Sequence, residues 1–179
     1  MATVDNSVSR MSKLLQQLQS GDTSGPRQRV RVAAVVAEAV ERCRNREPAP
    51  ELTDDSDDLH VWIDRERFVS VLGHLIRNAQ EATRRDGHVR IRVAQADGGA
   101  LIEIADDGCG MDAVFVRDRL FRPFDTTKGS KGMGIGAYQA RMFVTDAGGS
   151  LKVESAPGEG TRFFVRLPVH DPGSAIPVP

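Results

Sequence analysis

A glycine-rich stretch, Lys128–Tyr138, places the tightest constraint on how this chain can fold. It contains two lysines and then three alternate glycines, at Lys128, Lys131, Gly132, Gly134 and Gly136. Glycine lets the backbone adopt positive φ and approach a bulky anion. A helix that begins directly behind it directs unpaired N–H groups and about half a positive charge at that anion. The stretch therefore predicts a phosphate-binding loop, and the alternative is a flexible loop before an ordinary helix. Its spacing matches neither the P-loop nor the dinucleotide-binding fingerprint.

Composition limits the classes of function that remain. The chain has 179 residues, the size of one domain with attached segments. Its net charge of −1 provides no general attraction to nucleic acid or to an anionic membrane surface. Cys43 and Cys109 form no metal-ligand pattern and are typical of a reduced intracellular protein. No apolar run approaches the roughly 18–20 residues that span a bilayer. We therefore expect a cytoplasmic chain without nucleic-acid or membrane contact, whether or not its parent protein is membrane-anchored.

The N-terminal residues 1–20 carry a heptad pattern. Apolar residues recur at alternating spacings of four and three, at Val4, Val8, Met11, Leu15 and Leu18. This pattern predicts an amphipathic helix that packs against another helix, and a homodimer through residues 4–18 is compatible with it. A linker is expected at residues 21–28, the main domain at 29–168, and a disordered, proline-rich tail at 169–179.

The main domain alternates between strand and helix patterns. Strands are expected at residues 29–32, 59–63, 88–94, 100–104, 150–155 and 161–167, and helices at 33–44, 64–84 and 132–144. The acidic segment Glu47–Asp58 is interpreted as a solvated loop, because nothing spaces its carboxylates around a metal ion. The order predicts an α/β two-layer sandwich, in which helices cover one face of a mixed or antiparallel sheet, with a helical segment at the N-terminus.

Three polar residues form a line on the long helix expected at 64–84. His74, Asn78 and Glu81 follow one another at spacings of four and three, beside the apolar stripe. Asparagine disfavours a helix interior. Its amide oxygen is a ligand that Mg²⁺ accepts when phosphates supply other oxygens. The alternative is a polar residue at the core boundary with an ordinary hydrogen-bond partner.

Two further motifs occur where predicted strands end or begin. Asp106-Asp-Gly-Cys-Gly110 places a carboxylate after a strand, followed by glycines whose backbone is free to approach a flat ligand. A carboxylate accepts a hydrogen bond from an exocyclic amine such as adenine N6, and a hydrogen bond to a charged group contributes about 1.5–3 kcal/mol. Gly158-Glu-Gly-Thr161 by itself is typical of a hairpin turn, as the Asp-Gly pair is of a plain turn.

The order of these motifs resembles the Bergerat ATP-binding fold of gyrase, Hsp90, MutL and the histidine kinases. Along the chain they are His-x-x-x-Asn on a helix, Asp-x-Gly-x-Gly after a strand, Gly-x-Gly-x-Gly before a helix, and Gly-x-Gly-Thr. The segment Leu120–Lys128 is similar to the F box of sensor histidine kinases, and the resemblance covers residues 27–168. The finer resemblance is to the PrsK-type kinases of PEP-CTERM/exosortase systems.

The resemblance implies ATP and Mg²⁺ as ligands and a role for individual residues. Asn78 would hold Mg²⁺, and the implied catalytic residues are Asn78, His74 and Lys128. Around the base and the metal it implies Glu81, Asp106, Gly108, Gly110 and Thr161. Residues 111–131 would form an ATP lid with apolar anchors at Phe121 and Phe124. The implied contacts to the triphosphate are Lys128, Lys131, Gly132, Met133, Gly134, Ile135 and Gly136.

The position of His74 and the other histidines narrow the implied activity. ATPases of this fold generally carry a Glu where this chain has His74, and histidine there fits a kinase whose acceptor is an imidazole. The histidines are His60, His74, His88 and His170, and none has the setting of a phosphoacceptor. The resemblance implies a catalytic domain that donates the ATP γ-phosphate to a histidine-bearing dimerisation domain of the parent kinase, with a response regulator downstream. The alternatives are a nucleotide-sensing module without kinase activity and a stand-alone ATPase.

Overall fold

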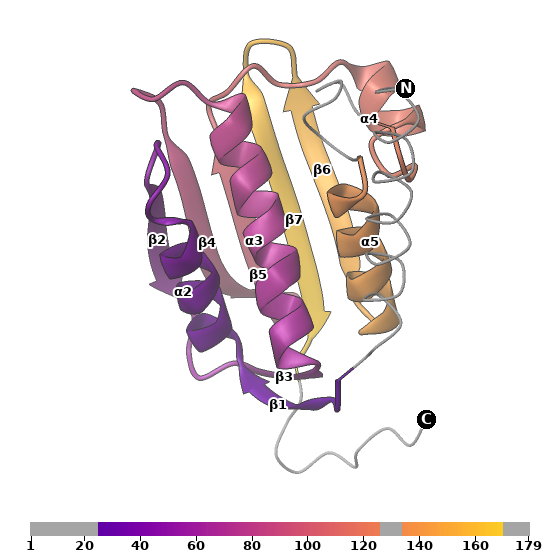
Figure 1. Cartoon of the computed structure of the whole chain (residues 1–179). Helices are drawn as coiled ribbons and strands as arrows, with labels where there is room; N and C mark the ends of the chain where they lie inside the picture. The colour runs from indigo at the N-terminus through magenta and orange to yellow at the C-terminus, as the bar shows by residue number, and fades with distance from the viewer. Residues whose placement is uncertain (1–24, 126–133, 170–179) are drawn as a thin grey trace, which may run out of the picture.

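A five-stranded mixed sheet forms one layer of the fold (Figure 1). The structure is a computed structural model that describes residues 25–125 and 134–169. In sheet order the strands are β2 (Pro50–Asp55), β4 (Val89–Ala96), β5 (Gly99–Asp106), β7 (Gly160–Pro168) and β6 (Ser150–Ala156). β2 runs parallel to β4, and the other neighbouring pairs are antiparallel. Both hairpins that the sequence predicts, β4–β5 and β6–β7, are confirmed.

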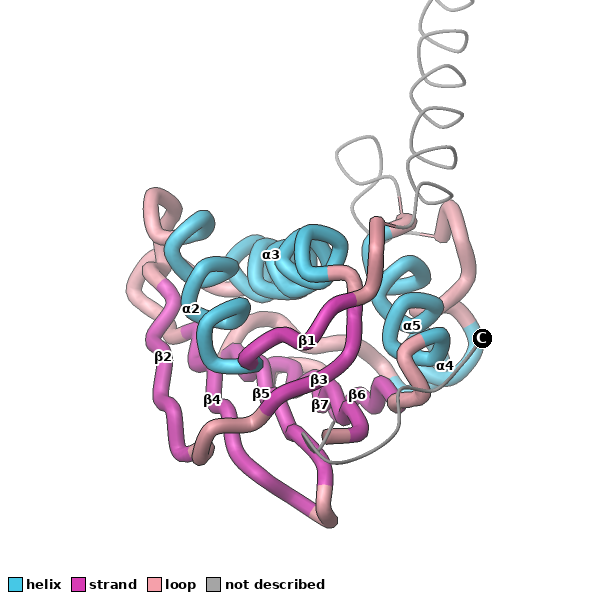
Figure 2. Tube along the Cα trace, turned by 90° about the horizontal axis from the view of Figure 1, so that it is seen from below, coloured by secondary structure: helices cyan, strands magenta, loops and turns pink. Residues whose placement is uncertain are grey.

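Helices form the second layer on one face of this sheet, as Figures 1 and 2 show. They are α2 (Val32–Cys43), α3 (Arg65–Ala82) and α5 (Gly136–Asp146). On α3 the side chains of Phe68, Leu72 and Ile76 are at most 1% exposed, and alternate residues of β5, including Ile102 and Ile104, are equally buried. The 3.6-residue period of the helix and the two-residue period of the strand thus meet in one aliphatic core. The predicted α/β two-layer sandwich is confirmed.

The acidic segment Glu47–Asp58 contains the edge strand β2, so its interpretation as a solvated loop is wrong. The buried side-chain amide of Gln80 on α3 fixes the approach to this strand. Its Nε2, with two protons to donate, lies within hydrogen-bond distance of the carbonyl oxygens of Cys43, Arg46 and Pro48. On the strand itself Asp55 pairs with Arg92 of β4. An acidic edge strand lacks the apolar alternation that identifies strands, and its charges discourage pairing with other chains.

Several predicted boundaries differ from the structure or lie outside it. The predicted helix at residues 1–20, residues 21–24 of the linker and residues 170–179 of the tail lie outside the described residues. The helix expected from Gly132 begins at Gly136. A short helix that the sequence did not predict, α4 (Ala113–Asp118), follows the Asp106–Gly110 motif, and the side chain of Asp112 caps its first turn.

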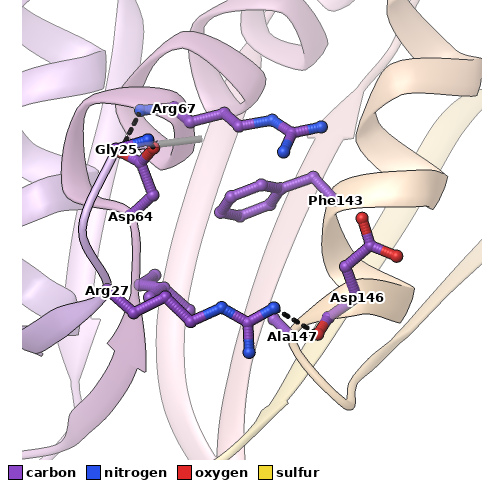
Figure 3. A pocket seen from close by; sticks show the side chains of 8 residues that line it. Gly25, Arg27, Asp64, Arg67, Phe143, Asp146 and Ala147 are labelled. Atoms are coloured by element: carbon purple, nitrogen blue, oxygen red, sulfur yellow. Dashed lines mark hydrogen bonds between the residues drawn. The ribbon is translucent and has the colours of Figure 1, made fainter. Parts of the chain in front are cut away.

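The first described residues of the chain contact the N-terminus of α3 and the C-terminus of α5. Here β1 (Gln28–Arg31) and β3 (His60–Ile63) form a separate antiparallel pair. Asp64 accepts hydrogen bonds from the N–H groups of Gly25, at 2.6 Å, and Arg67, at 3.1 Å, and thereby also caps α3. Arg27 donates to the carbonyl oxygen of Asp146 in the last turn of α5, at 3.0 Å. Figure 3 shows the small pocket that these residues line.

We expect Asp64→Ala to destabilise the domain because it removes the α3 cap and the tie to the entering chain together. Loss of a helix cap alone costs about 0.5–2 kcal/mol, and we expect the upper part of this range. Urea denaturation followed by circular dichroism measures the change. Asp64→Asn keeps one of the two acceptor oxygens, so it can retain either the cap or the tie to the entering chain and should lose less stability than Asp64→Ala. Equal losses in both variants would contradict the assigned capping role.

Candidate functional site

The middle of α3 and the first turn of α5 lie in contact. A Cβ atom added at Gly136 would lie 3.6 Å from Cδ2 of His74 and 3.8 Å from Nδ2 of Asn78. The structure therefore brings the predicted His-x-x-x-Asn pair to the beginning of a helix, where backbone N–H groups lack partners within the helix. Glu81, the third member of the predicted line, forms a salt bridge with Arg46, at 3.0 Å. The contact with Gly136 is thus made by His74 and Asn78.

The Asp106–Gly110 motif lies at the end of β5, next to the C-terminus of α3. The Asp106 side chain accepts from the N–H of Gly108 at 2.9 Å, which folds the loop back over the strand end. The N–H of Cys109 donates to the carbonyl oxygen of Ala82 at 3.1 Å and joins this loop to the last turn of α3. A Cβ atom at Gly108 would lie 2.5 Å from the same carbonyl oxygen, so glycine is required by this close approach.

Thr161 lies directly opposite Asp106 in the β5–β7 register. Its side chain is 6% exposed, and its hydroxyl lies 3.0 Å from Oγ of Ser155 on β6. The turn before Thr161 packs on the Asp106 motif. A Cβ atom at Gly160 would lie 1.9 Å from the carbonyl oxygen of Asp106, and one at Gly110 would lie 1.9 Å from that of Ala156. The structure therefore brings the Asp-x-Gly-x-Gly and Gly-x-Gly-Thr motifs together.

The described part of the predicted lid is attached to α5. Phe121 is half-buried, and the guanidinium of Arg141 on α5 lies 5.0 Å from its ring centroid. Phe124 is 52% exposed, with φ at 69°, and its N–H donates to the carbonyl oxygen of Gly134. The hydrogen bond from Arg119 holds the pKa of Asp125 below its ordinary value. Phe121 is thus the packed member of the predicted pair of apolar anchors.

The residues before α5 only partly match their predicted role of approaching a triphosphate. Gly134 has φ at +64°, and a Cβ atom there would lie 2.4 Å from the carbonyl oxygen of Asp125, so contact with the protein itself requires glycine. Ile135 is 5% exposed and belongs to the apolar interior. Gly136 has neither a positive φ nor a neighbouring atom that would exclude a side chain. The remaining predicted phosphate contacts lie outside the described residues: Lys128, Lys131, Gly132 and Met133.

His74 is held in its neutral form. Its Nδ1 lies 3.0 Å from the carbonyl oxygen of Ser70. Burial, followed by the charge of Arg77, lowers the pKa of His74 below its ordinary value of 6.5. If Nδ1–H donates to the Ser70 carbonyl, the neutral ring keeps Nε2 as an acceptor. Sequence reasoning did not identify Arg77 or Arg141 near this site, because ordinary helix-surface arginines carry no distinctive motif.

The donor set suits a metal ion that is shared with phosphates. Within residues 25–125 and 134–169, no group of three or more His, Cys, Asp or Glu side chains is arranged to hold a metal. Mg²⁺ is commonly bound by one or two protein oxygens together with phosphate oxygens and water, so the amide oxygen of Asn78 fits that requirement. In the same described part of the chain, no helix has the length and apolar character needed to cross a bilayer.

The arrangement defines an ATP-binding domain of the histidine kinase type, and comparisons with known proteins agree. Residues 63–171 match the family described as histidine kinase-, DNA gyrase B- and HSP90-like ATPase. The chain therefore belongs to this family, whose domain binds ATP. Within this family, the chain is similar to sensor histidine kinases and to the catalytic domain of one of them. The predicted family is thus confirmed, while the finer resemblance to PrsK-type kinases stays a prediction.

The similar proteins are sensor kinases. The chain is 41% identical over 113 residues to the C4-dicarboxylate transport sensor protein DctB of Rhizobium meliloti, covering 62% of this chain and 18% of DctB. It is 38% identical over 117 residues to the sensor histidine kinase CitA of Klebsiella pneumoniae, covering 63% of this chain and 21% of CitA. The chain thus matches about a fifth of each relative.

Solved structures give the same result. The mycobacterial sensor histidine kinase MprB superposes with a TM-score of 0.71 at 25% identity, covering 80% of this chain and 97% of that structure. The catalytic domain of histidine kinase ThkA superposes with a TM-score of 0.68 at 26% identity, covering 80% of this chain and 96% of that one. Both matches span nearly the whole of the other structure, so the shared unit is this domain.

The depressed pKa of His74 predicts a pH-dependent stability. The unfolded chain binds a proton at this position more readily than the native protein. This group therefore does not reduce the free energy of unfolding above about pH 6.5. As the pH falls toward the native pKa, the free energy of unfolding drops by about 1.4 kcal/mol for each unit between the two pKa values. We expect His74→Asn to lose less stability than the wild type between pH 7 and 5, measured by urea denaturation. A His74 NMR titration with its midpoint at or above 6.5 would contradict the assignment.

Proposed function

We propose that this domain binds ATP with Mg²⁺ and donates the γ-phosphate to a histidine on a dimerisation domain of the parent kinase. The observation that carries the proposal is the meeting of Asn78 with the first turn of α5 at Gly136. That contact puts the side-chain amide of Asn78 beside a helix N-terminus, a setting that favours anionic groups such as phosphates. Membership of the family and the similarity to sensor kinases support it.

The base would lie at the other end of the site, at the end of β5. Asp106 supplies an acceptor for the exocyclic amine of adenine, and Thr161 lies opposite it in the sheet register. Gly108 and Gly110 allow their loop to lie in backbone contact with Ala82 and Ala156. Adenine at one end and phosphates at the other place ATP between α3 and α5.

The phosphate end would combine residues of α3 with the segment before α5. Asn78 would hold Mg²⁺, which when bound neutralises phosphate charge. His74 lies beside it, and its lowered pKa keeps the imidazole neutral so that it adds no charge there. Lys128 and Lys131 would supply the positive charge for the β- and γ-phosphates. Glu81 would act at the margin of the site, because it already pairs with Arg46.

The transfer itself needs an acceptor imidazole from outside this domain. A nitrogen of that imidazole would form a bond to the γ-phosphorus while the bond to the β–γ bridging oxygen breaks, and ADP leaves. The lone pair of a neutral imidazole is already a nucleophile, so a general base in the position of His74 is not required. In the parent kinase the phosphoryl group would pass on to a response regulator, and residues 4–18 would belong to its dimerisation element. Domain limits of 1–20, 21–28, 29–168 and 169–179 are proposed accordingly.

Substitutions at the two ends of the site test nucleotide binding. We expect Asn78→Ala and Asp106→Asn each to weaken binding of a non-hydrolysable ATP analogue with Mg²⁺ at least tenfold, because a hydrogen bond to a charged group contributes about 1.5–3 kcal/mol. Calorimetry measures the change. Asn45→Ala and Asp107→Asn are matched controls at exposed positions. Normal binding by both site variants would contradict the residue assignments.

Substitutions at Gly136 and Gly134 distinguish a glycine needed for contact with the ligand from one needed for packing within the protein. Gly136→Ala meets no atom closer than 3.6 Å, so we expect an unchanged fold and at least a tenfold loss of ATP-analogue affinity if phosphates approach this backbone. Gly134→Ala would collide with the carbonyl of Asp125 and should disturb the segment before α5 even without nucleotide. Thermal denaturation and calorimetry distinguish these effects. Unimpaired binding by Gly136→Ala would place the phosphates elsewhere.

Transfer in trans tests the kinase function directly. The domain is mixed with labelled ATP and the histidine-bearing dimerisation domain of a similar sensor kinase. Label on the acceptor that disappears in the Asn78→Ala variant supports the proposal. Nucleotide binding without transfer to any of several acceptors would favour a sensing module, and steady phosphate release by the isolated chain would favour an ATPase.

A further inference from the structure

Three polar side chains form a row across the end of the sheet. Asp106 on β5 faces Thr161 on β7, and Thr161 in turn faces Ser155 on β6. The three positions share the sheet face of the buried residues Ile104 and Phe163, since side chains two residues apart on a strand point the same way. The row therefore lies on the helix-covered face, at the strand ends where we place the base.

The hydroxyl of Ser155 is the hydrogen-bonding centre of this row. It accepts from the backbone N–H of Met111 at 2.8 Å and donates to the carbonyl oxygen of Gly160 at 2.8 Å. Its third neighbour is the hydroxyl of Thr161, at 3.0 Å. One side-chain oxygen thus joins the loop after Gly110, the turn before β7 and the residue opposite Asp106.

The polarity of the third hydrogen bond follows from the other two. A hydroxyl has one proton and two acceptor lone pairs. An N–H group can only donate and a carbonyl can only accept, so Met111 takes one lone pair of Ser155 and Gly160 takes its proton. A lone pair is all that remains for Thr161. The Thr161 hydroxyl must therefore donate to Ser155, and toward the ligand it can only accept.

We propose that Ser155 is a positioning residue that makes Thr161 an obligatory hydrogen-bond acceptor and so contributes to the choice of nucleotide base. The wall formed by Asp106 and Thr161 then presents only acceptors. A base with an exocyclic amine at this position, as in adenine, supplies the matching donor, directly or through a water. A base with a carbonyl there, as in guanine, meets acceptor against acceptor. The inference rests on the proposed function, in which these two residues contact the base.

The test compares two nucleotides in the same protein. Calorimetry with Mg²⁺ and non-hydrolysable analogues of ATP and GTP gives the ratio of their affinities. In Ser155→Ala the Thr161 hydroxyl is released to donate as well, so we expect the preference for adenine to fall about three- to tenfold, the value of one hydrogen bond. Ser155→Thr keeps the hydroxyl and should keep the preference. Ser150→Ala, at the other end of β6, is the matched control.

A double substitution shows whether Ser155 acts through Thr161. Thr161→Val should lower the adenine preference by a similar factor, and adding Ser155→Ala to it should change the ratio by less than about twofold. Equal loss of both affinities in Ser155→Ala would show a purely structural role and overturn the inference, as would a Ser155→Thr variant that behaves like Ser155→Ala. A wild-type domain that binds neither analogue would overturn the proposed function itself, which is a different result.

Discussion

The site depends on two places where strand ends meet in backbone contact. Any side chain at Gly110 or Gly160 would overlap a carbonyl oxygen, with 1.9 Å to Ala156 in one case and 1.9 Å to Asp106 in the other, and both glycines have positive φ. Glycine at these positions lets the loop after β5 and the β6–β7 turn close on each other. That closure places Asp106 and Thr161 side by side without help from a ligand. Recognition of a flat base can therefore be built from groups whose positions are fixed in advance.

The second constraint is the rotation of α3. Its apolar face packs on the sheet and sets which side of the helix is left for polar groups. His74 and Asn78 then face the first turn of α5, while Gln80 reaches the turn that leads into β2. One helix thus fixes the position of an edge strand and of the proposed phosphate end of the site. A change that rotated α3 would disturb both, which is why its core residues matter to the site although they do not touch it.

Local sequence patterns predicted those elements in which the spacing of apolar residues matches the burial of their side chains in the structure. The hairpins, α3 and the two-layer arrangement follow from apolar spacing, and the order of the motifs indicated the family. Strand β2 escaped prediction because its pairing with β4 and its tie to Gln80 are long-range, and its own residues are acidic. The reason that position 134 is glycine was also hidden, since the carbonyl of Asp125 that excludes a side chain there is nine residues away. Ser155 gave no signal either, because a serine before a turn is ordinary until its three partners are known.

The two ends of the proposed site would bind the nucleotide through different interactions, hydrogen bonds at the base and charge at the phosphates. At the proposed base position, the polarity of the hydrogen bonds among the strand ends would decide which base binds. That polarity follows because the N–H of Met111 can only donate to Ser155 and the carbonyl of Gly160 can only accept from it. At the proposed phosphate end, the lowered pKa of His74 keeps its ring neutral, so attraction would come from the helix N-terminus, Mg²⁺ and the lysines before α5. Charge gives strength but little discrimination between nucleotides, which share the same triphosphate. The choice of base would therefore be made by the hydrogen-bond acceptors in the row of Asp106, Thr161 and Ser155.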